Sequence, residues 1–140
     1  MILGLDISTS IVGATILSDD GEVKETFAWD MRNKNHFPDI FTKYNHVQGE
    51  FLDMLVSRDI EYIFIEQSLQ MFRSGFSSAK TLSTLASFNG VVSYLCYREF
   101  GIKPEYISAS SARKSCGITI SRGTKAKEQV IKFLLDNEPK

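Results

Sequence analysis

Cysteine, proline and long apolar runs are all scarce in this chain of 140 residues. Two cysteines, three prolines and nine glycines argue against a disulfide framework and exclude a collagen-like or low-complexity chain. A membrane-spanning helix needs about 20 consecutive apolar residues, whereas the apolar stretches Ile11–Leu17 and Tyr62–Ile65 are far shorter. The N-terminus lacks the basic and apolar regions of a signal peptide. We therefore expect one intracellular, cytoplasmic domain covering residues 1–140, without a membrane contact.

Several catalytic motifs are absent as well. The sequence has no nucleophile elbow, no Walker phosphate loop and no dinucleotide-binding fingerprint. His36 and His46 are ten residues apart, with no Cys or His at a zinc-like interval, so we expect surface histidines. Cys96 falls in an apolar helical pattern and Cys116 in a loop, so we expect two free thiols.

Charges of opposite sign are separated along the sequence, although the whole chain carries a net charge of only −1. Residues 1–66 hold five basic and twelve acidic side chains, a net charge of −7. Residues 67–132 hold ten basic and three acidic side chains, a net charge of +7. This separation indicates a polyanion-binding face beside an acidic site, with an ordinary solvated surface as the alternative.

Hydrophobic periodicity predicts both strands and helices. Five short β-branched or alternating runs are expected to be strands: residues 2–7, 11–17, 23–29, 62–65 and 104–108. Apolar residues at three- and four-residue spacing predict three helices: residues 40–57, 82–100 and 124–134. Asp19-Asp20-Gly21 predicts a hairpin turn, and Gly101 is expected to end the second helix. The order β-β-β-α-β-α-β-α predicts an α/β fold, in which a mixed five-stranded sheet of three antiparallel and two helix-linked strands is flanked by helices.

Two acidic residues interrupt otherwise apolar strands. Asp6 lies within the most apolar strand of the chain, and Glu66 follows four apolar or aromatic residues. A buried carboxylate without a partner costs several kcal/mol, so each must be paired, metal-bound or open to water. If the two strands are neighbours, both carboxylates meet at one sheet edge and can bind a divalent cation such as Mg²⁺. Two strand-end acids that cap loops are the alternative interpretation.

Two polar segments have the composition of phosphate-binding segments. Ser8-Thr9-Ser10, directly after the first strand, is either a phosphate-binding hairpin or a plain turn. Residues 108–127 place basic side chains among small hydroxyl residues, which lets a phosphate backbone approach the charges. A solvated loop and helix face is the alternative, because no base-reading motif is present. The basic residues of this segment are Arg113, Lys114, Arg122, Lys125 and Lys127.

Taken together, these segments resemble the RuvC family of Holliday junction resolvases, within the ribonuclease-H-like superfamily. The resemblance runs from Ile2 to about Leu135. It rests on Gly4-Leu5-Asp6 with the Ser-rich hairpin, on Ile63-Phe64-Ile65-Glu66-Gln67, and on matches along residues 107–130. It implies a ribonuclease-H-like fold and Mg²⁺-dependent cutting of four-way junctions or other branched DNA by a homodimer. Mn²⁺ would be a substitute for Mg²⁺, and the protein would act in DNA recombination and repair at the nucleoid.

The resemblance also implies roles for individual residues. Asp6 and Glu66 match the first two metal-binding carboxylates of the family and would be catalytic, by activating a water that attacks the phosphodiester. Lys125 matches a basic residue near the scissile phosphate and would be catalytic too. The residues expected to bind DNA are Arg73, Lys80, Arg113, Lys114, Arg122, Lys125 and Lys127.

The loop after Glu66 departs from the family pattern. The family carries an aromatic wedge three residues after the glutamate, where this chain has Leu69. Met71 or Phe72 would then open the junction instead. All three residues are therefore wedge candidates.

A second departure concerns the rest of the metal site. The remaining carboxylates of the family lie on a last helix, as Asp-x-x-Asp or Asp-x-x-His, which we expect beyond Lys140. Asp136 and Glu138 have the wrong spacing to replace them. The resemblance therefore implies either a C-terminally truncated nuclease domain, which would cut poorly or not at all in its 140-residue form, or a metal site that a partner completes.

Three other functions remain open. One is a branched-DNA binding module that does not cut. Another is a fragment of an actin-like or sugar-kinase ATPase, whose first phosphate hairpin also reads Gly-x-Asp-x-Ser/Thr but which needs a second domain for the nucleotide. The third is an RNA-directed nuclease on the same fold.

Overall fold

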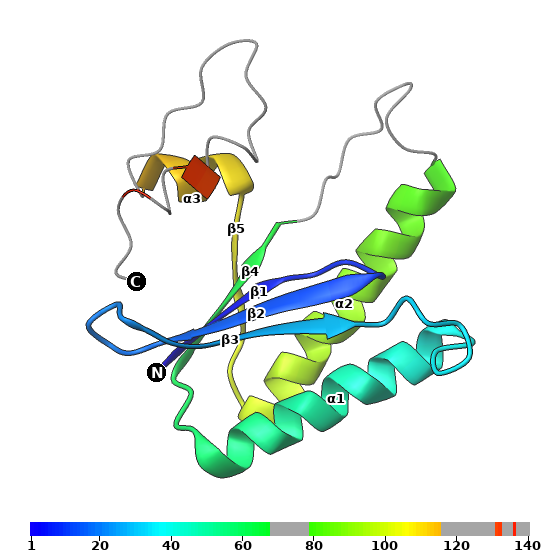
Figure 1. Cartoon of the computed structure of the whole chain (residues 1–140), viewed down its shortest axis with the longest axis horizontal. Coiled ribbons are helices and arrows are strands. Elements are labelled where there is room, and N and C mark those ends of the chain that lie inside the picture. Colours follow the sequence, from blue (N-terminus) through cyan, green and yellow to red (C-terminus); the bar gives the residue numbers. More distant parts are fainter. Residues whose placement is uncertain (68–78, 116–130, 133–135, 137–140) are drawn as a thin grey trace. The chain divides into compact units, whose positions relative to one another are not determined.

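The computed structural model describes residues 1–67, 79–115, 131–132 and 136. The chain forms two compact units, Met1–Tyr106 and Ile107–Lys140. In chain order, the elements are β1 (Ile2–Asp6), β2 (Ile11–Leu17), β3 (Val23–Asp30), α1 (Ile40–Ser57), β4 (Tyr62–Glu66), α2 (Ala79–Phe100), β5 (Glu105–Ile107) and α3 (Ala109–Ser115) (Figure 1). The single domain expected over residues 1–140 stays a prediction.

A mixed five-stranded sheet forms the centre of the first unit, in the order β3-β2-β1-β4-β5. β1 pairs antiparallel with β2 and parallel with β4, and β2 pairs antiparallel with β3. The predicted mixed sheet is thus confirmed. β1 ends at Asp6, one residue earlier than predicted, and β5 is shorter than the predicted strand at residues 104–108.

One face of the sheet packs against α1 and α2. Successive strand residues point to opposite faces, and Leu3 and Leu5 of β1 are buried on the face that the helices cover. Figure 1 shows α1 and α2 running next to each other on this side of the sheet. The buried apolar residues of the resulting core are Leu3, Leu5, Ile7, Val12, Ala14, Ile16, Trp29, Met31, Val47, Phe51, Met54, Ile60, Ile63, Ile65, Phe88, Val92, Leu95 and Cys96.

The other face of the sheet, here called the second face, carries the alternate strand residues. Its members in β1 and β4 are Ile2, Gly4, Asp6, Tyr62, Phe64 and Glu66, and its members in β2 and β3 are Ile11, Gly13, Thr15, Leu17, Thr26, Ala28 and Asp30. In the first unit, α1 and α2 both cover the opposite face. The two unusual acids of β1 and β4 therefore lie away from the apolar core.

Local signals in the sequence account for several element ends. Asp39 caps the N-terminus of α1, because its Oδ1 accepts a hydrogen bond of 2.9 Å from the amide of Thr42. Gly21, with a φ of 88°, completes the predicted turn between β2 and β3, and Gly101, with a φ of 70°, ends α2 as predicted. The Gly101 amide donates to the carbonyl of Tyr97 over 2.9 Å.

The helix α3 was not predicted. Ser108 begins it: its Oγ accepts from the amide of Ser111 at 3.1 Å, and its carbonyl accepts from the amide of Ala112 at 2.9 Å. Of the predicted helix at residues 124–134, only residues 131–132 are described, and these are helical. No helix among the described residues is long and apolar enough to span a bilayer.

Candidate active site

Asp6 and Glu66 occupy equivalent ends of two neighbouring parallel strands. The residues directly before them, Leu5 and Ile65, are register partners in the β1–β4 ladder. Both partners are buried on the core side, with exposed fractions of 4% and 0%. Since strand side chains alternate, Asp6 and Glu66 both point to the second face, on strands spaced about 4.8 Å apart. The sequence prediction that these acids meet at one sheet edge agrees with this placement.

The two carboxylates differ in their surroundings. Asp6 is exposed to solvent and Glu66 is half-buried. Like charges facing each other across a sheet repel, and a cation held between them removes that repulsion. Carboxylate oxygens are the ligands that Mg²⁺ prefers, and Mg²⁺ keeps several of its waters when one or two carboxylates bind it. As a donor set, these two residues fit such a cation. Among the described residues, no group of three or more His, Cys, Asp and Glu side chains forms a candidate metal site.

Gly13 of β2 lies opposite Asp6 on the other side of β1. A Cβ added at Gly13 would meet the Cβ of Asp6 at 3.8 Å, an ordinary van der Waals distance. Glycine is therefore not required there by a clash. Its effect is to leave free the volume beside the Asp6 carboxylate that a longer side chain would occupy.

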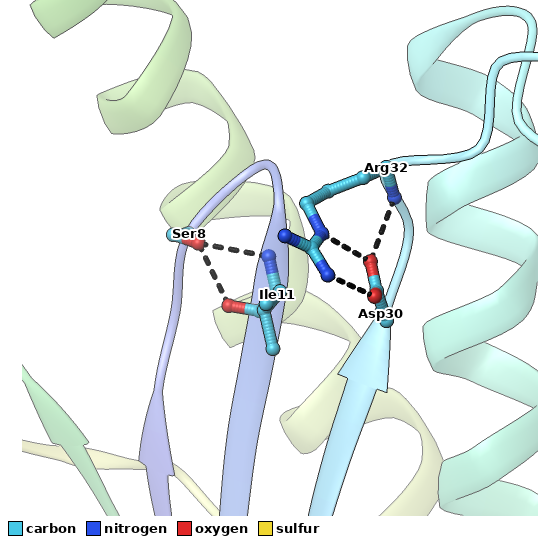
Figure 2. Close-up of polar contacts among 4 residues, drawn as sticks. All are labelled: Ser8, Ile11, Asp30 and Arg32. Atoms are coloured by element: carbon cyan, nitrogen blue, oxygen red, sulfur yellow. Dashed lines mark hydrogen bonds and ion pairs between the residues drawn. The ribbon is translucent and has the colours of Figure 1, made fainter.

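The Ser-rich hairpin between β1 and β2 is internally hydrogen-bonded. Ser8 Oγ donates to the carbonyl of Ile11 over 2.7 Å and accepts from the amide of Ile11 at 3.0 Å (Figure 2). It also accepts from the amide of Ser10 at 3.3 Å. Lys43 of α1 donates to the carbonyl of Thr9, which holds the hairpin against the helix. Since these amides already have a partner, the geometry favours the plain turn over the phosphate-binding hairpin.

An ion pair that sequence reasoning missed lies at the end of β3. The guanidinium of Arg32 donates from Nε to Oδ1 of Asp30 at 2.8 Å and from Nη2 to Oδ2 at 2.6 Å (Figure 2). The Arg32 amide also donates to Oδ1, at 3.1 Å. Hydrogen bonds from the Arg32 side chain and then from its backbone lower the pKa of Asp30 to about 2. The only sequence signal was opposite charges two residues apart at a strand end.

Few of the expected DNA-binding residues can be placed. Lys80 is exposed near the start of α2, Lys114 is exposed in α3, and Arg113 belongs to the same helix. The residues that lie outside the described part of the chain are Leu69, Met71, Phe72, Arg73, Arg122, Lys125 and Lys127. Their roles stay predictions.

The histidines and Cys96 agree with their expected structural roles. His36 is exposed, and His46 of α1 packs edge-on against Phe37, with ring centroids 5.2 Å apart. Cys96 is a free thiol inside the core, and burial raises its pKa to about 12. A thiol in this state is neither a nucleophile nor a metal ligand at neutral pH.

The comparison with solved structures identifies the fold, whereas the comparisons of sequence find no match. No protein-family model matches the sequence, and no curated protein matches it. Thermus thermophilus RuvC in complex with a Holliday junction substrate superposes with a TM-score of 0.69 at 12% identity, covering 99% of this chain and 80% of that one. A second structure of T. thermophilus RuvC gives 0.60 at 15% identity, covering 99% and 81%.

A mitochondrial protein has the same architecture. The yeast mitochondrial Holliday junction resolvase Ydc2 matches with a TM-score of 0.55 at 16% identity, over 96% of this chain and 60% of Ydc2. This chain thus spans less than two thirds of Ydc2. Together with the sheet order and the second-face acids, these matches show that the chain has the ribonuclease-H-like fold of the RuvC and Ydc2 Holliday junction resolvases.

Proposed function

We propose that this chain is a divalent-metal-dependent endonuclease that cuts four-way junctions or other branched DNA. The observation that carries the proposal is the placement of Asp6 and Glu66 at the ends of neighbouring parallel strands, on the same face of the sheet. The fold supports it, because a similar structure, T. thermophilus RuvC, is a complex with a Holliday junction substrate.

Asp6 and Glu66 would hold the cation, Mg²⁺ or Mn²⁺, through their carboxylate oxygens. A cation bound there supplies an activated water and neutralises charge on the phosphate oxygens. The protein contributes the position of both carboxylates through the β1–β4 ladder. The bare backbone at Gly13 leaves room beside Asp6 for the phosphodiester.

Basic side chains from the second half of the sequence would bind the DNA backbone. Lys80 and Lys114 are exposed and can neutralise phosphate charge. Lys125 near the scissile phosphate and a wedge from Leu69, Met71 or Phe72 complete the proposal. We also propose that the protein acts as a homodimer that cuts both strands symmetrically, and that it acts at cellular DNA.

Two alternatives make different predictions. A branched-DNA binding module would bind junctions without cutting them. An ATPase fragment needs a hairpin that offers hydrogen-bond donors to phosphate, and the amides of Ser10 and Ile11 instead donate to Ser8 Oγ. The hairpin geometry therefore speaks against the ATPase alternative.

The test is cleavage of a synthetic four-way junction by the full-length protein. The junction is incubated with protein and Mg²⁺, and a linear duplex of the same arm sequence and a sample with EDTA serve as controls. Metal-dependent nicks near the crossover, without cutting of the duplex, are expected. Tight junction binding without any cut in Mg²⁺ or Mn²⁺ would overturn the nuclease and favour the binding module. Faster cutting of a junction with RNA arms would favour the RNA-directed alternative.

A further inference from the structure

The Arg32 guanidinium is fixed in direction by Asp30. Two of its nitrogens, Nε and Nη2, donate to the two carboxylate oxygens at 2.8 and 2.6 Å. In Figure 2 the third nitrogen points away from the carboxylate. The Arg32 side chain is 65% exposed. An arginine held in this way presents its outer N–H groups in one orientation, so less rotamer entropy is lost when it binds a second anion.

The register of the sheet places Asp30 on the same face as the candidate metal ligands. Asp6 pairs with Gly13 of β2, and two residues earlier in β2, Ile11 pairs with Asp30 of β3. Directly paired residues share a face, as do residues two apart in a strand. Asp30 therefore lies on the second face, at the sheet edge where β1 and β4 end.

Strand geometry gives the separation of the two sites. Asp30 is two strands away from Asp6, at about 4.8 Å per strand, and two residues further along, at about 3.3 Å per residue. The two Cα atoms are therefore on the order of 12 Å apart. A DNA strand advances about 3.4 Å per nucleotide along its axis, so this separation corresponds to roughly three nucleotides.

The charge of the surrounding chain indicates where a DNA strand needs a hydrogen-bond donor such as Arg32. Residues 1–66 carry a net charge of −7, so DNA that approaches Asp6 and Glu66 meets charge of its own sign. Like Arg32, two other cations of this part of the chain pair with carboxylates, Arg58 with Glu25 and Lys24 with Glu22, and Lys43 donates to the carbonyl of Thr9. Arg32 differs from these cations in its place, at the end of β3, where its third nitrogen is directed away from Asp30 and can donate to a phosphate.

We propose that Arg32, oriented by Asp30, binds a backbone phosphate of the DNA strand within about three nucleotides of the phosphate at Asp6 and Glu66. This inference rests on the proposed function, since it places a DNA strand on the second face. Arg32 is then a substrate-binding residue, and Asp30 is a positioning residue that acts through it. Because the pKa of Asp30 is about 2, the carboxylate stays ionised throughout the pH range of a DNA-binding assay.

Binding measured without cleavage tests this inference separately from the nuclease. The full chain is titrated with a four-way junction in EDTA at several salt concentrations. Loss of one phosphate contact makes the negative slope of log K against log salt shallower by about 0.9, and lowers the affinity at 0.1 M salt by roughly five- to tenfold. Arg32→Ala should show both changes. Lys24→Ala is the matched control, since Lys24 also lies on β3 beside an acid, Glu22 at 3.5 Å, but at the other end of the strand.

The positioning role and the location of the phosphate need two further measurements. Arg32→Lys keeps the positive charge but loses the planar guanidinium, whose N–H groups can bind two oxygens at once. It should therefore show the salt slope of the wild type but only part of its affinity. Asp30→Asn should weaken binding less than Arg32→Ala does. A neutral methylphosphonate is placed in turn at each of the three nucleotides on either side of the phosphate at the crossover. At one of these positions it should weaken the wild type and leave Arg32→Ala unchanged.

Several outcomes would overturn the inference. One is an unchanged salt slope in Arg32→Ala, and another is an equal loss in Lys24→Ala. A third is equal sensitivity of wild type and Arg32→Ala to every methylphosphonate. Circular dichroism checks folding, and Arg32→Gln takes the place of Arg32→Ala if the latter unfolds. Failure of the wild type to cut in Mg²⁺ would count against the nuclease, whereas the slopes would still decide the role of Arg32.

Discussion

Asp6 and Glu66 end neighbouring parallel strands, one residue beyond the register partners Leu5 and Ile65. Their side chains share the second face because the residues before them are buried in the core on the opposite side. The apolar pattern of β1 and β4 thus fixes the direction of both carboxylates. The core and the candidate active site are specified by alternate residues of the same two strands.

Gly13 provides a test of the space beside Asp6. A Cβ at this position makes only an ordinary contact, and glycine within a strand costs about 0.5–1 kcal/mol relative to alanine. Gly13→Ala should therefore raise the free energy of unfolding by about that amount and leave junction cleavage nearly unchanged. Gly13→Leu should fold but lose cleavage, because its side chain fills the volume beside the carboxylate. Equal cleavage by the Leu and Ala variants would show that this volume is not used.

Phe51 tests the packing of α1 on the sheet. Its ring is fully buried and makes edge contacts with Trp29 and Phe100, at centroid distances of 5.9 and 5.4 Å. Phe51→Ala should lower the free energy of unfolding by about 3–5 kcal/mol. Val56 on the same helix is 89% exposed, so Val56→Ala should change stability by less than about 0.5 kcal/mol. Urea unfolding of both variants measures the difference, and similar values would contradict the described core.

Cys96 should resist thiol reagents while the protein is folded. Burial raises its pKa from the ordinary value of 9.0 to about 12, so the reactive thiolate is scarce at pH 8. Because the folded pKa lies above the unfolded one, the associated stability is complete below about pH 9 and is lost as the pH rises towards 12. In Cys116→Ser, where Cys96 is the one remaining thiol, Ellman's reagent should react slowly in buffer and fully in urea. Rapid labelling in buffer would contradict the burial of Cys96.

Asp30 should stabilise the protein in a pH-dependent way. Its folded pKa of about 2 lies below the ordinary value of 3.8, so its ion pair with Arg32 stabilises the fold above about pH 4. That contribution is lost as the pH falls from about 4 to 2. The stability difference between the wild type and Asp30→Asn, from urea unfolding, should be constant between pH 5 and 7 and shrink below pH 4. The change should be small, because the pair is exposed. A difference that is constant down to pH 2 would contradict the ion pair.

The sequence predicted most of the sheet but not every feature of the site. Alternation and β-branched runs located all five strands, β5 with longer bounds than observed, and Asp6 and Glu66 were recognised because acids in apolar strands need an explanation. Helix α3 was missed because a short Ser-rich segment has no apolar periodicity, and its start depends on hydrogen bonds of Ser108. The Asp30–Arg32 pair was missed because only the strand register shows that Asp30 lies on the same face of the sheet as Asp6. A local charge pair does not reveal that it shares a face with Asp6.

The most direct test of the central claim is the metal dependence of junction cleavage in Asp6→Asn and Glu66→Gln, with Asp20→Asn in the β2–β3 turn as control. Both amide variants keep the side-chain shape but lose the charge that holds a cation. Each should bind the four-way junction as the wild type does, with cleavage at least about a hundredfold slower. Asp20→Asn should cut normally. Cleavage by Asp6→Asn and Glu66→Gln at the rate of the Asp20→Asn control would contradict the assignment of these two carboxylates as the metal ligands of a nuclease.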